Sequence, residues 1–172
     1  KTTNGGTNWT AQTSGTNSTL FEIFFLDANT GYSAGDNGTI RKTTNGGTNW
    51  VAQTSGTTNS LYEVHFIMNN TGFVAGSGGM VRRTTNGGTN WVGQTSGTTQ
   101  SLLDIRFSSY SVNANIYSIG NNGTIISTTN SGTNWYAQNS GTTNDLYEIH
   151  FTYPTVGYTA GQNGTILTTT NG

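Results

Sequence analysis

The stretch Thr43–Trp50 reads TTNGGTNW, and this octapeptide occurs four times, with one Gly replaced by Ser in the last copy. The copies end at tryptophans that lie 41, 41 and 44 residues apart, namely Trp9, Trp50, Trp91 and Trp135. A fixed period of this length is typical of a repeat architecture, in which one small unit is stacked on its neighbours. The sequence therefore predicts one domain, 1–172, made of units 1–41, 42–82, 83–126 and 127–167 and the start of a fifth, 168–172.

Each unit contains short runs with the alternation of a β-strand. In Leu61–Ile67 the apolar Tyr62, Val64 and Phe66 alternate with polar residues, and the other units repeat this pattern. Period two with β-branched and aromatic residues indicates a strand. The three further strands expected after it are Phe73–Gly76, Met80–Thr85 and the tryptophan-bearing Thr89–Thr95.

The second and third expected strands are joined by a pair of turn residues. The pair is Asn37-Gly38 in the first unit, and Asn-Gly or Gly-Gly in the others. Such pairs favour a tight hairpin, because a type I′ turn needs positive φ at both central residues. Four short antiparallel strands per repeat are typical of a propeller blade. The predicted fold class is an all-β β-propeller with about four four-stranded blades, forming a four-bladed ring or part of a larger one.

Composition excludes several classes of function. Only 8% of the residues are charged and the net charge is −1, so no basic surface for nucleic acid is expected. No apolar run approaches the length of a membrane helix, so no membrane insertion is expected. The chain has no cysteine, which excludes disulfides and thiolate metal sites, and its glycine clusters belong to hairpins. We expect no cofactor and no metal.

The octapeptide resembles the Asp-box, or BNR repeat, which reads Ser/Thr-x-Asp-x-Gly-x-Thr/Ser-Trp. Thr2, Gly6 and Trp9 match its first, fifth and eighth places, and the other copies agree. The whole repeat, with LYEVHF (61–66), TGFVAG (71–76) and NGTI (37–40), is similar to the photosystem II stability/assembly factor-like repeats. The resemblance implies a β-propeller. Such repeats are widespread in bacterial secreted and surface proteins, so we expect an extracellular or cell-surface location.

The box departs from that pattern, because Asn stands in the place of the Asp. Asn tolerates a left-handed backbone and can bond nearby amides, so it can replace Asp in a turn. A tryptophan buries a large apolar area and can anchor the outer strand. We interpret the box as a folding element rather than a ligand site. Its residues are Asn4, Gly6, Trp9, Asn45, Gly47, Trp50, Asn86, Gly88, Trp91, Asn130, Gly132 and Trp135.

One recurrence in the first strand is a candidate site. The same place holds an acid in every unit, namely Glu22, Glu63, Asp104 and Glu148, and two residues further on stand Phe24, His65, Arg106 and His150. In a propeller the first strand is innermost, so these acids would surround a channel and could bind a cation or a basic partner. The alternative is that each acid pairs with a His, an Arg or backbone amides of a neighbouring blade.

One further candidate is an insertion that only the third unit has. Tyr110 lies in this three-residue insertion, which is either a recognition loop or a neutral surface insertion.

A sialidase, to which Asp-box proteins are related, needs an arginine triad, a Tyr–Glu nucleophile pair and an acidic Asp. This chain has four arginines, two of them adjacent, so no catalytic site is expected.

We therefore expect a non-catalytic interaction or structural module that binds protein partners or copies of itself. The alternatives are a lectin-like module, in which exposed indoles stack on sugar, and a degenerate glycosidase-related domain. Closure of the ring is open, because 1–5 and 168–172 are copies of the same segment. The N-terminal strand could complete the last blade, the chain could be a window from a longer array of repeats, or two chains could complete a larger ring.

Overall fold

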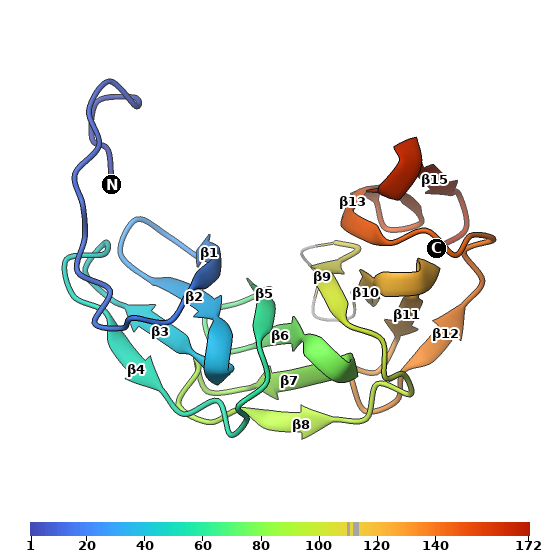
Figure 1. Ribbon diagram of the computed structural model, residues 1–172, viewed down its shortest axis with the longest axis horizontal. Coiled ribbons are helices and arrows are strands. Elements are labelled where there is room, and N and C mark those ends of the chain that lie inside the picture. Colours follow the sequence, from blue (N-terminus) through green and yellow to red (C-terminus); the bar gives the residue numbers. More distant parts are fainter. Residues whose placement is uncertain (110, 112–113) are drawn as a thin grey trace.

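A computed structural model describes residues 1–109, 111 and 114–172. The chain folds into four antiparallel sheets that follow one another along an open arc (Figure 1). The first sheet has the order β1-β2-β3-β4 and the second β5-β6-β7-β8, while the third is β9-β10-β11-β12 and the fourth β13-β14-β15. The protein is thus an all-β propeller fragment of four blades, in which the fourth blade holds three strands.

The strands repeat with nearly constant lengths. The first blade consists of β1 (Leu20–Phe25), β2 (Gly31–Gly35), β3 (Ile40–Thr43) and β4 (Val51–Gln53). The second consists of β5 (Leu61–Phe66), β6 (Gly72–Gly76), β7 (Met80–Thr84) and β8 (Val92–Gln94). The third consists of β9 (Leu102–Phe107), β10 (Ile116–Gly120), β11 (Ile125–Thr128) and β12 (Tyr136–Gln138). The fourth consists of β13 (Leu146–Tyr153), β14 (Val156–Gly161) and β15 (Ile166–Thr169).

The turn between the second and third strands has the predicted backbone. Asn37 and Gly38 have φ values of 57° and 66°, and the Thr39 amide donates to the Asp36 carbonyl over 3.0 Å. The other three hairpins have the same pair of positive φ values. These turns form the short 3₁₀ segments Asp36–Gly38, Ser77–Gly79, Asn121–Gly123 and Gln162–Gly164.

The core lies between blades rather than within them. Tyr32, Ala34 and Ile40 of the first blade pack against Leu61 and other residues of the second, and all four are at most 1% exposed. A second cluster joins the second and third blades, and a third joins the third and fourth. Each blade therefore covers the apolar face of its neighbour, as stacked repeats require.

The strand that faces the core differs from the predicted alternation at one point. Leu61 is fully buried, whereas Tyr62 is half-buried, although the alternation placed Tyr62 on the same face as Val64 and Phe66. The register shifts between Leu61 and Glu63, which is a β-bulge. A bulge inserts one residue and thereby turns Leu61 to the side of Val64. The other three blades have the same irregularity at the start of their first strands.

The fourth strand is also shorter than predicted. β4 covers three residues and begins after Trp50, because the turn of the box occupies the preceding residues and pairing starts at Lys42 and Val51. The predicted strand Thr7–Thr13 is not a strand in this structure. Residues 1–13 form an arm beside the first blade (Figure 1), in which Lys1 and Thr10 exchange backbone hydrogen bonds of 2.8 Å.

The arc places the four first strands at its inner edge and the fourth strands at its outer edge (Figure 1). β1, β5, β9 and β13 contact one another in succession along the inner edge. The two termini lie at opposite ends of the arc, so the N-terminal arm does not complete the fourth blade of its own chain. The described residues include no helix long and apolar enough to span a membrane.

Candidate functional site

The box at the outer rim binds its own backbone. Thr43 Oγ1 donates to Asn45 Oδ1 over 3.0 Å, and Asn45 Oδ1 also accepts the amide of Asn49 over 2.9 Å. The Gly47 amide donates to Thr43 Oγ1 over 2.9 Å. Equivalent bonds occur around Asn4, Asn86 and Asn130. The side-chain carbonyl oxygen of Asn supplies the acceptor that a carboxylate would supply, without its charge.

The four tryptophans differ in their solvent exposure. Trp91 and Trp135 are 6% and 8% exposed, and each indole packs edge-on against a phenylalanine, with centroids 5.8 Å and 6.3 Å apart. Trp50 packs edge-on against Phe25 at 6.0 Å and is half-buried, because no blade precedes the first. Trp9 in the arm is 75% exposed. The two indoles in the middle of the arc leave no face on which a sugar could stack.

The acidic residues of the first strands lie along the inner edge of the arc, where one arginine forms ion pairs with three of them. Arg106 on β9 lies 2.7 Å from Asp104 Oδ1 and 3.2 Å from Glu148 Oε1, and its Nη1 also binds Glu63 Oε1. The same Nη1 donates to His65 Nδ1 over 3.3 Å. We call Glu63, His65, Asp104, Arg106 and Glu148 the inner cluster.

Backbone atoms also hold the inner cluster. Asp104 Oδ2 accepts the amide of Ile149 in the next blade over 2.8 Å. Asp104 and Glu63 have side chains that are 2% and 6% exposed, whereas that of Glu148 is 64% exposed. Each buried acid of the row therefore contacts a neighbouring blade, through Arg106 or through a main-chain amide.

Two members of the predicted set remain outside the inner cluster. Glu22 on β1 is half-buried and forms no ion pair with the described residues. His150 on β13 is exposed. Tyr110 lies outside the described residues. No group of three or more His, Asp or Glu side chains in the described part of the chain is placed to hold a metal ion.

Burial dominates the electrostatics of this edge. Desolvation raises the pKa of Glu22, Glu63 and Asp104 to about 7 each, although the nearby Arg106 acts in the opposite direction. Desolvation, with Arg106 as the second cause, lowers the pKa of His65 to about 4. His65 is therefore neutral near pH 7, and among the described residues Arg106 is the one permanent cation beside four carboxyl groups.

A pocket of about 370 Å³ opens beside the inner cluster, between β9 and β13. Its lining includes His65, Arg106, Phe107, His150 and Tyr153, of which Tyr153 is 69% exposed. Polar groups and aromatic faces thus converge on one opening, the usual character of a binding site. Tyr153 was not among the residues predicted from the sequence. The signal for it was the adjoining Pro154, the only proline, which makes this turn unlike its three copies.

Solved structures show which folds the chain is similar to. A structure of "YCF48 bound to D1 peptide" has a TM-score of 0.66 and 24% identity, and the match covers 89% of this chain and 55% of that one. YCF48 from Cyanidioschyzon merolae has a TM-score of 0.57 and 16% identity, with 96% and 74% covered. The chain spans about half of the YCF48 chain in the peptide complex.

Two further structures share the fold at low identity. The computationally designed Ika4 protein is matched over 100% of its length and 95% of this chain, with a TM-score of 0.75 and 16% identity. An ancestral GH74 enzyme has a TM-score of 0.74 and 21% identity, and the match covers 24% of it and 95% of this chain. No curated protein matches the chain.

One family model matches the sequence itself. The model of the photosynthesis system II assembly factor YCF48 matches residues 1–96, which is more than half of the chain. This finding corrects one expectation. The predicted extracellular or cell-surface location is wrong, because the family is that of a photosystem II assembly factor of the thylakoid lumen. By its repeats, its propeller fold and this match, the chain belongs to the photosynthesis system II assembly factor YCF48 family.

Proposed function

We propose that this protein is a non-catalytic propeller that binds an extended segment of a partner protein along the inner edge of its arc. The observation that carries the proposal is the inner cluster, where one guanidinium faces an excess of carboxyl groups beside an open pocket. Family membership supports it, since one solved structure of YCF48 is that of the protein bound to a D1 peptide.

The charges favour a segment with a basic side chain. Arg106 is already held by three carboxyl groups, and His65 is neutral near pH 7. Glu148 is the acid of the inner cluster that solvent reaches, and Glu22 lies nearby on β1 without an ion-pair partner among the described residues. A lysine or arginine of the partner would satisfy these acids, while Tyr153 and Phe107 offer apolar contact.

The same arrangement argues against catalysis. Arg106 is held by ion pairs rather than free to bind a substrate carboxylate. The likeness to a GH74 enzyme rests on fold alone, at 21% identity, and a fold does not carry an activity. The lectin-like alternative requires equivalent exposed indoles, whereas Trp91 and Trp135 are buried.

The test measures peptide binding by fluorescence anisotropy. The probes are the D1 peptide and a pair of extended peptides that differ only in one Lys-to-Gln exchange. We expect the Lys peptide to bind more tightly than the Gln peptide. The variant Glu148→Gln should reduce that preference about two- to fivefold, the usual effect of an exposed ion pair.

The matched control is Asp145→Asn, a carboxyl-to-amide change in the linker before β13. Its amide oxygen can still accept the Asn122 amide that Asp145 now accepts over 2.9 Å. The control should leave the preference unchanged. If neither the D1 peptide nor the Lys peptide shows saturable binding, or if both variants weaken binding equally, the proposal is wrong.

A further inference from the structure

The chain contains seven Asn-Gly pairs, and they begin at Asn4, Asn37, Asn45, Asn86, Asn122, Asn163 and Asn171. The main-chain nitrogen of the next residue can attack the side-chain amide carbon of an asparagine, and glycine hinders this attack least because it has no Cβ. Asparagine is therefore one of the thermolabile residues of proteins. In a folded chain the reaction is slowed by the hydrogen bonds that hold the side chain and its turn. These bonds differ among the seven pairs.

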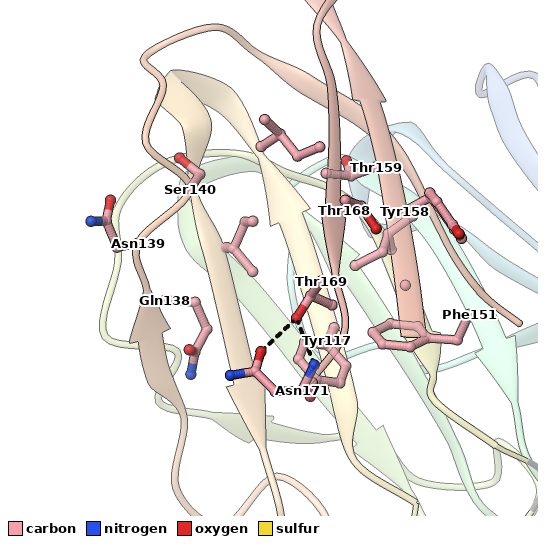
Figure 2. Close-up of a pocket in the computed structure, with 15 residues that line it drawn as sticks. Tyr117, Gln138, Asn139, Ser140, Phe151, Tyr158, Thr159, Thr168, Thr169 and Asn171 are labelled. Atoms are coloured by element: carbon pink, nitrogen blue, oxygen red, sulfur yellow. Dashed lines mark hydrogen bonds between the residues drawn. The ribbon is translucent and has the colours of Figure 1, made fainter. Parts of the chain in front are cut away.

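The asparagines of the box are held at both reacting groups. Asn45 Oδ1 accepts two hydrogen bonds, and the Gly46 amide, which contains the attacking nitrogen, donates to the Asn29 carbonyl over 2.9 Å. The next box along the chain has the same bonds. Asn171 Oδ1 likewise accepts from Thr169 Oγ1 over 3.0 Å, as a dashed line in Figure 2 shows. We therefore expect the box asparagines to be protected.

The other asparagines of this kind lie in the turn between the second and third strands of a blade. Three of the four turns are held by the residue two places before the first strand. Asn122 Nδ2 donates to Gln100 Oε1 over 3.0 Å, and Asn163 Nδ2 donates to Asn144 Oδ1 over 3.2 Å. In the second blade Asn59 Nδ2 donates to the first carbonyl of the turn over 3.0 Å. A linker side chain thus keeps each of these turns closed.

The turn of the first blade lacks this contact. The residue two places before β1 is Ser18, which has a shorter side chain than Gln100 and makes no hydrogen bond to the turn. The Asn37 side chain is exposed and has no hydrogen-bond partner among the described residues. The substitution is encoded in the linker itself, so the freedom of Asn37 is a property of this unit.

A second contact is also absent from the first blade. The main-chain amide of Asn122 donates to Asp145 Oδ1 over 2.9 Å, and Asp145 is the residue directly before the first strand of the next blade. The equivalent residue beside the first turn is Ser60, and its hydroxyl donates to Asp36 Oδ1 over 2.7 Å instead. Two hydrogen bonds therefore hold the turn at Asn122 that have no counterpart at Asn37.

We propose that Asn37 is a modification site, at which the protein deamidates by intramolecular attack. The Gly38 nitrogen forms a bond to Cγ of Asn37, the bond from Cγ to Nδ2 breaks, and ammonia leaves with the proton of the Gly38 amide. Water then opens the resulting succinimide. Hydrolysis at the side-chain carbonyl gives aspartate, and hydrolysis at the main-chain carbonyl gives isoaspartate. The inference is independent of the peptide site proposed above.

The conformation of the turn explains why these contacts decide the rate. Asn37 has φ 57° and ψ 34°, and Asn122 has φ 54° and ψ 38°. At such a ψ the nitrogen of the following glycine points away from Cβ, so the five-membered ring cannot close until the turn opens. Both turns start from the same conformation, and the one with fewer hydrogen bonds opens more often.

The two products differ in how they fit the turn. Gly38 is buried, and it packs so closely against the Thr57 carbonyl of the next linker that a Cβ there would overlap the oxygen. Isoaspartate adds one methylene to the main chain before Gly38 and thereby displaces it from this contact. Aspartate keeps the length of the main chain and tolerates a left-handed backbone. The isoaspartyl chain should therefore be the less stable of the two.

The first measurement compares Asn37 with Asn122 in the native chain. Their surroundings in sequence, GDNGTI (35–40) and GNNGTI (120–125), differ at one residue. The folded chain is incubated in heavy-oxygen water, and peptide mapping by mass spectrometry follows the uptake of the label at each site. We expect Asn37 to react roughly tenfold faster or more, the effect of two missing hydrogen bonds. In urea the two rates should become equal.

The second measurement exchanges the linker residues. Ser18→Gln should slow the reaction of Asn37 roughly fivefold, the effect of one hydrogen bond, and Asn122 in the same chain is the internal control. Gln100→Ser should speed Asn122 by a similar factor and leave Asn37 unchanged. Three results would overturn the proposal: equal rates at Asn37 and Asn122 in the folded chain, faster labelling of Asn45 than of Asn37, or a rate at Asn37 that Ser18→Gln does not change.

Discussion

Replacing Glu63 by Gln should change how the stability of this protein depends on pH. Desolvation raises the pKa of Glu63 from 4.5 to about 7 in the folded chain. One pKa unit corresponds to about 1.4 kcal/mol. Ionising Glu63 therefore costs about 3 kcal/mol more in the folded chain than in the unfolded chain. Because the folded pKa is the higher one, protonation of Glu63 stabilises the folded chain. This contribution to the free energy of unfolding is fully present below pH 4.5 and is lost as the pH rises through about 7.

The assay is urea unfolding followed by circular dichroism at pH values between about 5 and 8. The unfolding free energy of the native chain should fall over that range. In Glu63→Gln the fall should be smaller by about 3 kcal/mol. The glutamine side chain keeps an oxygen that can accept from Arg106, so the variant should fold. Asp145→Asn serves as the control and should leave the pH dependence of the native chain unchanged. Parallel curves for the native chain and Glu63→Gln would refute the reasoning.

The remaining predictions concern packing and backbone, and denaturant unfolding tests each of them. Gly79→Ala should destabilise by about 3 kcal/mol or more, because φ is +72° and the new Cβ would overlap a linker carbonyl oxygen; Gly97→Ala, at +78° with open space around it, should cost about 1–2 kcal/mol. Equal losses would show that the close approach is irrelevant. Trp91→Ala should cost about 3–5 kcal/mol, whereas Trp9→Ala should change the stability of the separate chain by less than about 0.5 kcal/mol. Ser131→Gly should stabilise by about 1 kcal/mol, because Ser131 has a φ of +56° where the other boxes have Gly; a loss of stability would contradict this.

Local signals predicted much of the fold. The alternation around Val64 and the Asn37-Gly38 pair depend on backbone preferences that act within a few residues, so strands and hairpins could be read from them. The bulge at Leu61 could not be read in this way, because it is set by the packing of one blade on the next. The length of β4 was overestimated because the turn of the box extends as far as Trp50.

The candidate site was predictable in position but not in connectivity. The common register of the four acids placed them on neighbouring first strands. Which of them Arg106 reaches depends on the length of that side chain and on the offset between blades, and neither quantity is visible in a sequence. Tyr153 was missed because its role depends on the pocket that β9 and β13 enclose.

The shared core between blades has a consequence for how such a gene can change its length. Insertion or deletion of one whole repeat preserves every contact between blades, because a residue in the place of Tyr32 still packs against one in the place of Leu61. Gain or loss of a fraction of a period would bring two unlike faces together. The three extra residues of the third unit fall between β9 and β10 and leave both strands in register with their neighbours. The fold is therefore kept when complete repeats are duplicated or exchanged unequally between gene copies.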